Sequence, residues 1–102
     1  MSAPQPLLTI GLPVYNGGRH IKIAVESLLE LSHGDFELLI SDNCSTDGTS
    51  EMCRELAAKH PRVRYWRNEE NIGVIKNFHL VLERAKGKYF MWAAHDDRWN
   101  QR

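Results

Sequence analysis

Two adjacent carboxylates, Asp96 and Asp97, are the strongest chemical signal in the sequence. They follow an aromatic run at residues 89–93 that predicts a β-strand, so they stand just beyond the carboxyl end of that strand. Carboxylates are hard oxygen ligands that Mg²⁺ or Mn²⁺ accepts, and such ions commonly complete their coordination with phosphate oxygens and water. The pair is equally compatible with a simpler role, in which one aspartate caps a turn and the other is solvated.

Polar groups also follow the first two apolar runs of the chain. Tyr15 and Asn16 come after a run ended by Pro13, and Asp42 ends the second run. Tyr15 could stack on a nucleobase or pack over a helix. Asp42 could accept hydrogen bonds from a base or a ribose, or it could hold an Asx turn. Lys76, in the first turns of a predicted helix, could meet a pyrophosphate or be solvated.

Several common functional motifs are absent from the sequence. No G-x-G-x-x-G follows the first predicted strand, which argues against a nicotinamide-type Rossmann site. Gly87 and Lys88 lack the upstream glycine and the Ser or Thr of a Walker A loop. A calcium loop beginning at Asn43 fails because its twelfth residue is Arg54, where a glutamate is required. Metal binding by oxygen ligands and nucleotide binding therefore remain as the possible functions.

The composition is that of an ordinary globular protein. The 102 residues suit one domain, and 13 basic against 13 acidic side chains give zero net charge, which argues against nucleic-acid binding. No apolar run approaches the ~20 residues of a transmembrane helix, and the first residues do not resemble a secretory signal. Cys44 and Cys53 lack metal-site spacing, so we expect reduced thiols and a cytoplasmic location.

Alternating strands and helices must position these residues. Apolar runs at residues 7–12, 36–40, 63–66 and 89–93 predict four strands, with the third at a sheet edge. Amphipathic stripes predict helices between them, and we expect the third helix to bury Ile75, Phe78, Leu82 and Ala85. The order β-α-β-α-β-α-β predicts an α/β fold with a mostly parallel sheet. Ligands bind beyond the carboxyl ends of the strands in such sheets, where the residues above stand.

Four segments, taken in order, carry a resemblance to a known family. They are residues 9–16 (T-I-G-L-P-V-Y-N), residues 38–49 (L-L-I-S-D-N-C-S-T-D-G-T), residues 71–73 (N-I-G) and residues 87–97 (G-K-Y-F-M-W-A-A-H-D-D). They are similar to an opening strand with a P-x-Y-N turn, a second strand with D-D-G-S-x-D-G-T, an N-x-G, and a G-x-Y leading into D-x-D-D. Together they resemble glycosyltransferase family 2, enzymes of the GT-A nucleotide-diphospho-sugar fold.

This resemblance implies a three-layer α/β/α arrangement, the Rossmann-like half of a GT-A domain. It implies transfer of a sugar from a nucleotide-diphospho-sugar donor to an unknown acceptor, assisted by Mg²⁺ or Mn²⁺. Asp96 and Asp97 would hold the metal ion. The residues expected at the nucleotide are Pro13, Tyr15, Asn16, Asp42, Lys76 and Asp96. A general base for the acceptor hydroxyl is expected beyond residue 102.

Three positions depart from the family pattern. Ala94 stands where the first aspartate of D-x-D normally lies, a change that bears on metal affinity more than on nucleotide binding. Asn43 and Cys44 replace the second aspartate and the glycine of the D-D-G-S-x-D-G-T segment.

On this resemblance, residues 1–102 are the N-terminal, donor-binding part of a truncated domain. Its full-length parent would be cytoplasmic or peripheral to a membrane. One alternative is a non-catalytic nucleotide-binding fragment or self-associating module that keeps the fold without turnover. A receiver-like signalling domain ranks last, because it would want an acidic pair after the first strand. A half-domain leaves apolar surface or a sheet edge uncovered, so we expect self-association.

Overall fold

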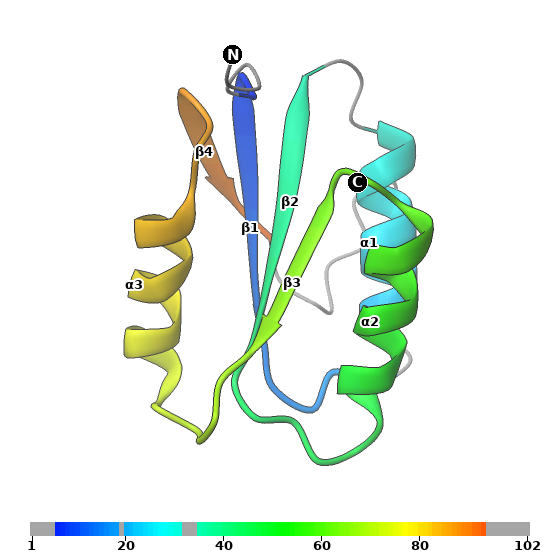
Figure 1. Ribbon diagram of the computed structural model, residues 1–102, viewed down its shortest axis with the longest axis vertical. Coiled ribbons are helices and arrows are strands. Elements are labelled where there is room, and N and C mark those ends of the chain that lie inside the picture. The colour runs from blue at the N-terminus through cyan, green and yellow to red at the C-terminus, as the bar shows by residue number, and fades with distance from the viewer. Residues whose placement is uncertain (1–5, 19, 32–34, 94–102) are drawn as a thin grey trace.

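The computed structural model describes residues 6–18, 20–31 and 35–93 (Figure 1). In this part of the chain strands and helices alternate in the predicted order. The elements are β1 (Leu8–Val14), α1 (His20–Leu31), β2 (Phe36–Asp42), α2 (Thr49–Lys59), β3 (Val63–Arg67), α3 (Val74–Arg84) and β4 (Tyr89–Trp92). The strands form one sheet in the order β3-β2-β1-β4, and all the pairings are parallel. The predicted α/β fold is confirmed, as is the edge position of the third strand.

Helices cover both faces of the sheet and make three layers. Figure 1 shows α1 and α2 together on one face and α3 on the other. The central strands β1 and β2 pair in register from Leu8 with Phe36 to Val14 with Asp42, so their carboxyl ends lie level at one edge. Pro13 lies inside β1 rather than ending it, because the strand continues to Val14. No helix in the described residues is long and apolar enough to cross a membrane.

The hydrophobic core lies between the sheet and the helices α1 and α2. Alternate residues of a strand point to the same face, so every second residue of β1 and β2 enters this layer. They meet the apolar stripes of the two helices that the periodicity predicts. The buried members of this core include Ile10, Leu12, Leu38, Ile40, Ile21, Val25, Leu28, Cys53 and Leu56.

Helix α3 packs differently from the sequence prediction. Ile75 is 74% exposed and Leu82 is 48% exposed, and Phe78 is also exposed, whereas the residues that α3 buries are Asn77 and Val81. The prediction that Ile75, Phe78 and Leu82 are core residues is therefore wrong, and Ala85, predicted with them, is only half-buried and caps the helix end.

The strand residues below α3 explain its unexpected orientation. Gly11 has no side chain and so leaves room for Val81 against β1. A Cβ added at Gly11 would lie 2.6 Å from the Val81 Cγ1 atom. Ser41 presents a hydroxyl and a carbonyl to this layer, and both bond the Asn77 amide. The side of α3 that faces the sheet therefore carries Asn77 and Val81, while Ile75 and Leu82 stay exposed.

Candidate functional site

A cleft opens at the carboxyl ends of β1 and β2, beside the first two turns of α3. Its volume is about 360 Å³, and it is lined by Pro13, Val14, Tyr15, Asn43, Val74, Asn77 and Phe78. This is the edge at which parallel sheets bind ligands, because the loops that follow the strands meet there. The cleft combines two aromatic rings and aliphatic walls with two amides.

Tyr15 and Phe78 give the cleft its aromatic character. Tyr15 follows β1 and is 46% exposed, and Phe78 stacks on Trp92 of β4 with ring centroids 4.7 Å apart. Aromatic faces that are partly open to solvent offer a stacking surface to a flat ring such as a nucleobase. Pro13 and Tyr15, both predicted at the nucleotide, are thus brought together in one cleft.

Asp42, also predicted at the nucleotide, lies outside the cleft. Its side chain is completely buried, and it accepts hydrogen bonds from the Ser45 backbone N–H (2.9 Å), the Ser50 hydroxyl and the Tyr65 hydroxyl (2.7 Å). Two hydroxyls and a backbone N–H therefore bond the carboxylate from within the protein, and it organises the loop that follows β2.

The environment of Asp42 keeps its carboxyl ionised. Burial is the largest single influence and raises its pKa, but the hydrogen bonds from Ser45, Ser50 and Tyr65 together outweigh burial and lower the pKa below its ordinary value. The neighbouring Tyr65 hydroxyl is affected in the opposite direction, because burial and the Asp42 carboxylate raise its pKa. Tyr65 therefore stays a hydrogen-bond donor.

Asn43 occupies the position in the cleft that sequence reasoning gave to Asp42. Adjacent strand residues point to opposite faces of a sheet, so Asp42 faces α2 while Asn43 faces α3. A signal in the sequence could have revealed this: Leu38, Ile40 and Asp42 share one parity and Asn43 has the other. The parallel register places the two loops side by side: Val14 pairs with Asp42, and the next residues, Tyr15 and Asn43, both line the cleft.

Asn16 connects two loops instead of lining the cleft. Its side-chain Oδ1 accepts the Thr46 N–H at 2.8 Å, and its own N–H donates to the Ser45 hydroxyl at 2.9 Å. The Gly18 N–H donates to the Thr49 hydroxyl in the same way, at 2.9 Å. These bonds hold the β1–α1 loop against the β2–α2 loop, so Asn16 supports the edge at which the cleft opens.

Lys76 lies on the outer side of α3 and does not line the cleft. It borders a separate hollow together with Ile72, His79, Leu80 and Glu83. The predicted contact with a pyrophosphate has no support from this position.

The predicted metal ligands Asp96 and Asp97, and Ala94 with them, lie outside the described residues. Within residues 6–18, 20–31 and 35–93, no group of three or more His, Cys, Asp or Glu side chains is placed to hold a metal ion. The metal prediction therefore stays a prediction.

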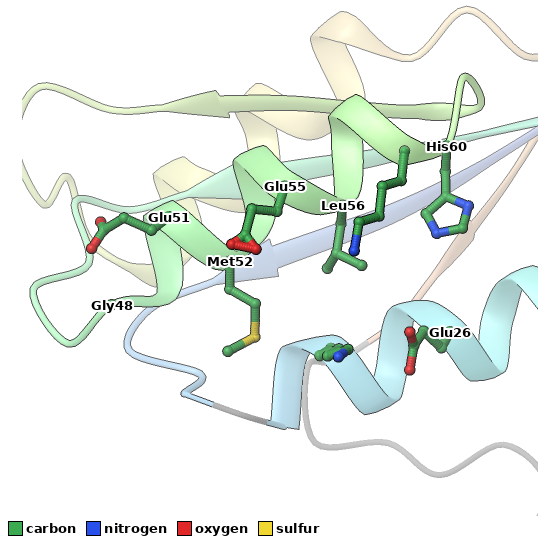
Figure 2. Close-up of a pocket in the computed structure, with 9 residues that line it drawn as sticks. Glu26, Gly48, Glu51, Met52, Glu55, Leu56 and His60 are labelled. Carbon is green, nitrogen blue, oxygen red and sulfur yellow. The ribbon is translucent and has the colours of Figure 1, made fainter.

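Another hollow lies between α1 and α2, on the other side of the sheet (Figure 2). It measures about 330 Å³ and is lined by Lys22, Glu26, Gly48, Glu51, Met52, Glu55, Leu56, Lys59 and His60. Its charged side chains have both signs and come from the solvent-facing rows of two helices. Such a groove is typical of two packed amphipathic helices, and nothing in it resembles the aromatic and amide lining of the cleft.

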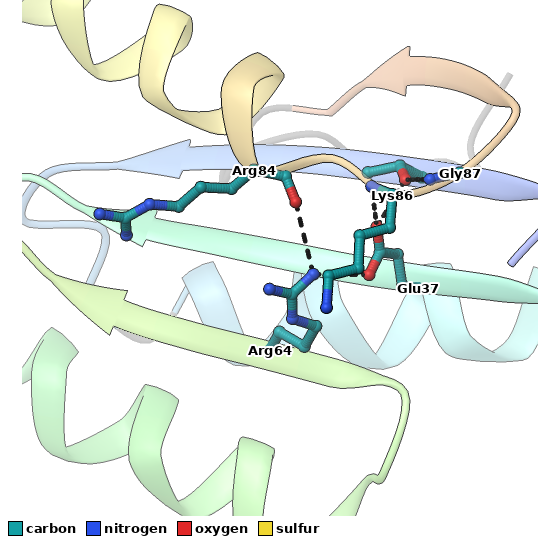
Figure 3. A network of polar contacts seen from close by, with 6 residues as sticks. Glu37, Arg64, Arg84, Lys86 and Gly87 are labelled. Atoms are coloured by element: carbon teal, nitrogen blue, oxygen red, sulfur yellow. Dashed lines mark hydrogen bonds and ion pairs between the residues drawn. The ribbon is translucent and has the colours of Figure 1, made fainter. Parts of the chain in front are cut away.

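A polar network secures the α3–β4 connection (Figure 3). Glu37 of β2 is buried and accepts hydrogen bonds from Thr9 (2.7 Å), the Lys86 N–H (2.7 Å) and Arg64 (2.8 Å). Burial raises the pKa of Glu37 and is the largest influence, but these donors together lower it below its ordinary value. The Gly87 N–H completes the network by donating to Thr9. The network fixes the approach to β4, the strand that precedes Asp96 and Asp97.

Comparison with known proteins identifies the family. The sequence profile described as Glycosyl transferase family 2 matches residues 9–102. The chain belongs to this family. The resemblance carried by the four sequence segments is thereby confirmed.

Relatives and solved structures agree with this membership. A Bacillus subtilis (strain 168) protein that carries the provisional name teichuronic acid biosynthesis glycosyltransferase TuaG is 35% identical over 97 residues, which are 95% of this chain and 38% of TuaG. Staphylococcus aureus TarS 1-349 in complex with UDP-GlcNAc matches with a TM-score of 0.80 and 25% identity over 88% of this chain and 26% of TarS 1-349.

A second solved structure matches almost the whole chain. The mannosyltransferase PcManGT from Pyrobaculum calidifontis, in complex with GDP-Man and Mn²⁺, matches with a TM-score of 0.85 and 25% identity over 97% of this chain and 30% of PcManGT. The chain therefore has the fold of GT-A glycosyltransferases and spans well under half the length of these relatives.

Proposed function

We propose that this chain is the donor-binding part of a glycosyltransferase that uses a nucleotide-diphospho-sugar. The observation that carries the proposal is the cleft beside Tyr15 and Phe78, at the edge where a parallel sheet binds its ligand. TarS with UDP-GlcNAc and PcManGT with GDP-Man support this donor class for the related fold.

The nucleoside is assigned to the cleft. Tyr15 supplies a face on which the base stacks, and Pro13 contributes a rigid wall beside it. Asp42 acts through the loop it organises, because its buried carboxylate already accepts the bonds from Ser45, Ser50 and Tyr65.

Asp96 and Asp97 are the proposed ligands of Mg²⁺ or Mn²⁺, and the Mn²⁺ in the PcManGT complex supports a divalent ion. A bound ion neutralises charge on the phosphate oxygens as the nucleoside diphosphate leaves. In the transfer, the acceptor hydroxyl oxygen bonds to the anomeric carbon, the bond from that carbon to the diphosphate breaks, and a base takes the hydroxyl proton. We assign neither that base nor the acceptor to any residue of this chain.

The decisive experiment is calorimetric titration of the chain with UDP, GDP and dTDP, with and without Mn²⁺. Tyr15→Ala removes the stacking face and is expected to weaken the tightest of these complexes about tenfold or more. Tyr89→Ala is the matched control, because Tyr89 is 57% exposed on β4 and does not line the cleft. No heat from any of the three nucleotides at millimolar concentration would overturn the proposal.

The competing function is a nucleotide-binding fragment without turnover. Ala94 in place of an aspartate favours it. Incubation of the chain with UDP-GlcNAc and Mn²⁺, with free UDP as the measured product, separates the two functions. Steady release of UDP would exclude the inactive fragment.

Self-association is a further part of the proposal. Helix α3 carries exposed Val74, Ile75 and Leu82. Apolar groups that lie this close together favour contact with a second surface. Light scattering over a range of concentrations measures it, and a strictly monomeric profile at high concentration would remove this part.

A further inference from the structure

Four asparagine side chains form one connected network between the sheet and α3. The Asn68 Nδ2 atom donates to the Oδ1 atoms of both Asn43 (3.1 Å) and Asn77 (3.0 Å). The Asn43 Nδ2 atom donates in turn to the Oδ1 atom of Asn71 at 2.9 Å. The network thus joins the end of β2, the residues after β3, the 68–73 loop and α3, and two of its members line the cleft.

Backbone groups fix the orientation of the amides that matter. The Ile72 N–H donates to Asn43 Oδ1 at 2.9 Å, and Asn43 Nδ2 donates to the Gly73 carbonyl at 3.2 Å. Asn77 Nδ2 donates to the Ser41 carbonyl at 3.0 Å. A backbone N–H can only donate and a carbonyl can only accept, so neither amide can be turned round without losing a partner.

All the hydrogen-bonding groups of the Asn43 side chain have partners inside the protein. Its amide has two donor hydrogens and two acceptor lone pairs, and the four bonds to Asn68, Asn71, Ile72 and Gly73 use them all. Although Asn43 borders the cleft, it has no group left to read a ligand by hydrogen bonding. Its contribution is to hold the loop that leads into α3.

Position is transmitted from that loop to the cleft through the start of α3. Gly73 has φ +88° and precedes the helix without a side-chain cap. Its carbonyl accepts from Asn43 Nδ2 and its N–H donates to Asn71 Oδ1, and these two bonds hold the backbone at the start of the helix. Val74 and Phe78, one turn apart on α3, form a wall of the cleft. Asn77 anchors the same turn to Ser41 of β2.

We propose that Asn43 and Asn77 are positioning residues that set the α3 wall of the cleft, and that each must be an amide rather than a carboxylate. This inference rests on the proposed nucleotide function only for its effect on ligand affinity. Its effect on the position of the 68–78 segment follows from the contacts alone.

The substitution Asn43→Asp separates this inference from the expectation that family likeness gives. Asn43→Asp restores the second aspartate of the family's D-D-G-S-x-D-G-T segment, so family likeness predicts a harmless or helpful change. In this chain it removes both donor hydrogens and places a carboxylate oxygen against the Gly73 carbonyl and Asn71 Oδ1. Asn77→Asp has the same defect against the Ser41 carbonyl.

Asn71→Asp is the matched control within the same network. Asn71 is exposed, and its Oδ1 atom accepts bonds from the Gly73 N–H and from Asn43, both of which a carboxylate can accept as well. The control makes the same chemical change, and the structure predicts the opposite outcome.

The test measures amide hydrogen exchange and nucleotide binding on the folded 102-residue chain. In Asn43→Asp, the Gly73 amide and the first turn of α3 are expected to lose protection while β1 and β2 keep theirs, because the carboxylate can still accept the Ile72 N–H but repels Asn71 Oδ1 and the Gly73 carbonyl. The Kd for UDP, GDP or dTDP, whichever binds the parent most tightly, is expected to rise about tenfold or more. Asn71→Asp is expected to keep the parent's protection and a Kd within about twofold.

Equal behaviour of Asn43→Asp and Asn71→Asp in both measurements would overturn the inference. If the parent binds none of the three nucleotides, the proposed function fails, and the exchange pattern alone still decides whether the amides position the segment. If both buried variants fail to fold by circular dichroism, Asn71→Ala replaces them, because it breaks the link at an exposed residue. The exposed variant must then lose protection at Gly73 that Asn71→Asp retains, and unchanged protection would contradict the proposal.

Discussion

The α1 and α2 face of the sheet packs aliphatic side chains, whereas the α3 face joins its layers by hydrogen bonds between amides and hydroxyls. On the first face, Ile10, Leu12 and Ile40 are completely buried. On the second, Ser41 and Asn77 exchange two hydrogen bonds. Burial of apolar surface is favourable but has no direction, while a hydrogen bond specifies where its partners lie.

This difference assigns the two faces different tasks. The aliphatic face supplies most of the free energy of folding, since each fully buried large apolar side chain contributes about 1.5–3 kcal/mol. A net hydrogen bond contributes only about 0.5–1.5 kcal/mol, so the amide face adds less stability. The cleft opens on the amide face, where the hydrogen bonds fix the positions of the lining residues more than they add to stability. Mutations on the two faces should therefore separate stability from binding.

The largest expected effect is on the aliphatic face. Ile40→Ala removes a completely buried side chain from the centre of the core and is expected to lower the free energy of unfolding by about 2–5 kcal/mol. Urea denaturation followed by circular dichroism measures the loss. Ile23→Ala is the control, because Ile23 is 45% exposed on α1, and it is expected to change stability by less than about 0.5 kcal/mol. Similar losses in both variants would contradict the core described above.

Gly11→Ala tests how closely Val81 of α3 and Phe90 of β4 approach the backbone of β1. The added methyl group would lie 2.5 Å from Phe90 Cζ and 2.6 Å from Val81 Cγ1, so we expect a loss of about 1–3 kcal/mol from overpacking. Nucleotide affinity should fall as well, since α3 carries a wall of the cleft.

The Gly11 prediction has an internal control in a double-mutant cycle. Val81→Ala opens space beside Gly11, so the double variant should lose less stability than the two single variants add up to. Strict additivity, measured by the same urea titrations, would mean that the close approach is not the cause.

Acidification should destabilise both faces through one buried carboxylate each. Asp42 and Glu37 have folded-state pKa values below their ordinary values of 3.8 and 4.5. Their stabilisation is therefore fully present above these ordinary values and is lost as the pH falls through the lower folded-state values. Asp42→Asn should flatten the acid limb of a stability–pH curve measured by urea denaturation. An unchanged slope would show that Asp42 does not titrate as described.

The smallest effect is expected on the outer side of α3. Ile75→Ser changes a side chain that is 74% exposed, so the free energy of unfolding should shift by less than about 0.5 kcal/mol. Self-association, measured by light scattering, should weaken in the same variant. Lys76→Ser, on the same helix but carrying no apolar side chain, serves as the control. A stability loss above 1 kcal/mol, on the order of a core mutation, would mean that Ile75 is packed after all.

The sequence predicted the aliphatic face better than the amide face for a physical reason. Helices α1 and α2 meet strands whose alternate residues are apolar, so the side with the most apolar residues is also the buried side. On α3 the same periodicity was misleading, because Gly11 and Ser41 lie below it and favour Val81 and Asn77. The apolar pattern of one helix does not reveal what the opposing strands offer.

The residues that line the cleft were likewise predicted only in part. Pro13 and Tyr15 follow from the carboxyl-end rule and do line the cleft. Asp42 was predicted at the nucleotide because it ends an apolar run and because the family resemblance implies it. The strand alternation that puts Asn43 in the cleft was available in the sequence, but it becomes decisive only once the register of β1 and β2 is known. Hydrogen bonds between distant amides, such as Asn43 with Asn71, leave no periodic signal.

The pairing of β1 with β4 has a consequence for how the chain is made. Gly87, at the approach to β4, bonds to Thr9 of β1 across 78 residues, so β1 receives its second neighbour only after these 78 residues have been synthesised. At about 5–20 residues per second, ribosomes leave that edge of β1 open for roughly 4 to 16 seconds. An apolar strand with an open edge is a template for aggregation during this interval. Nascent chains in which β1 has been synthesised but β4 has not are therefore expected to depend on chaperones more than the folded chain does.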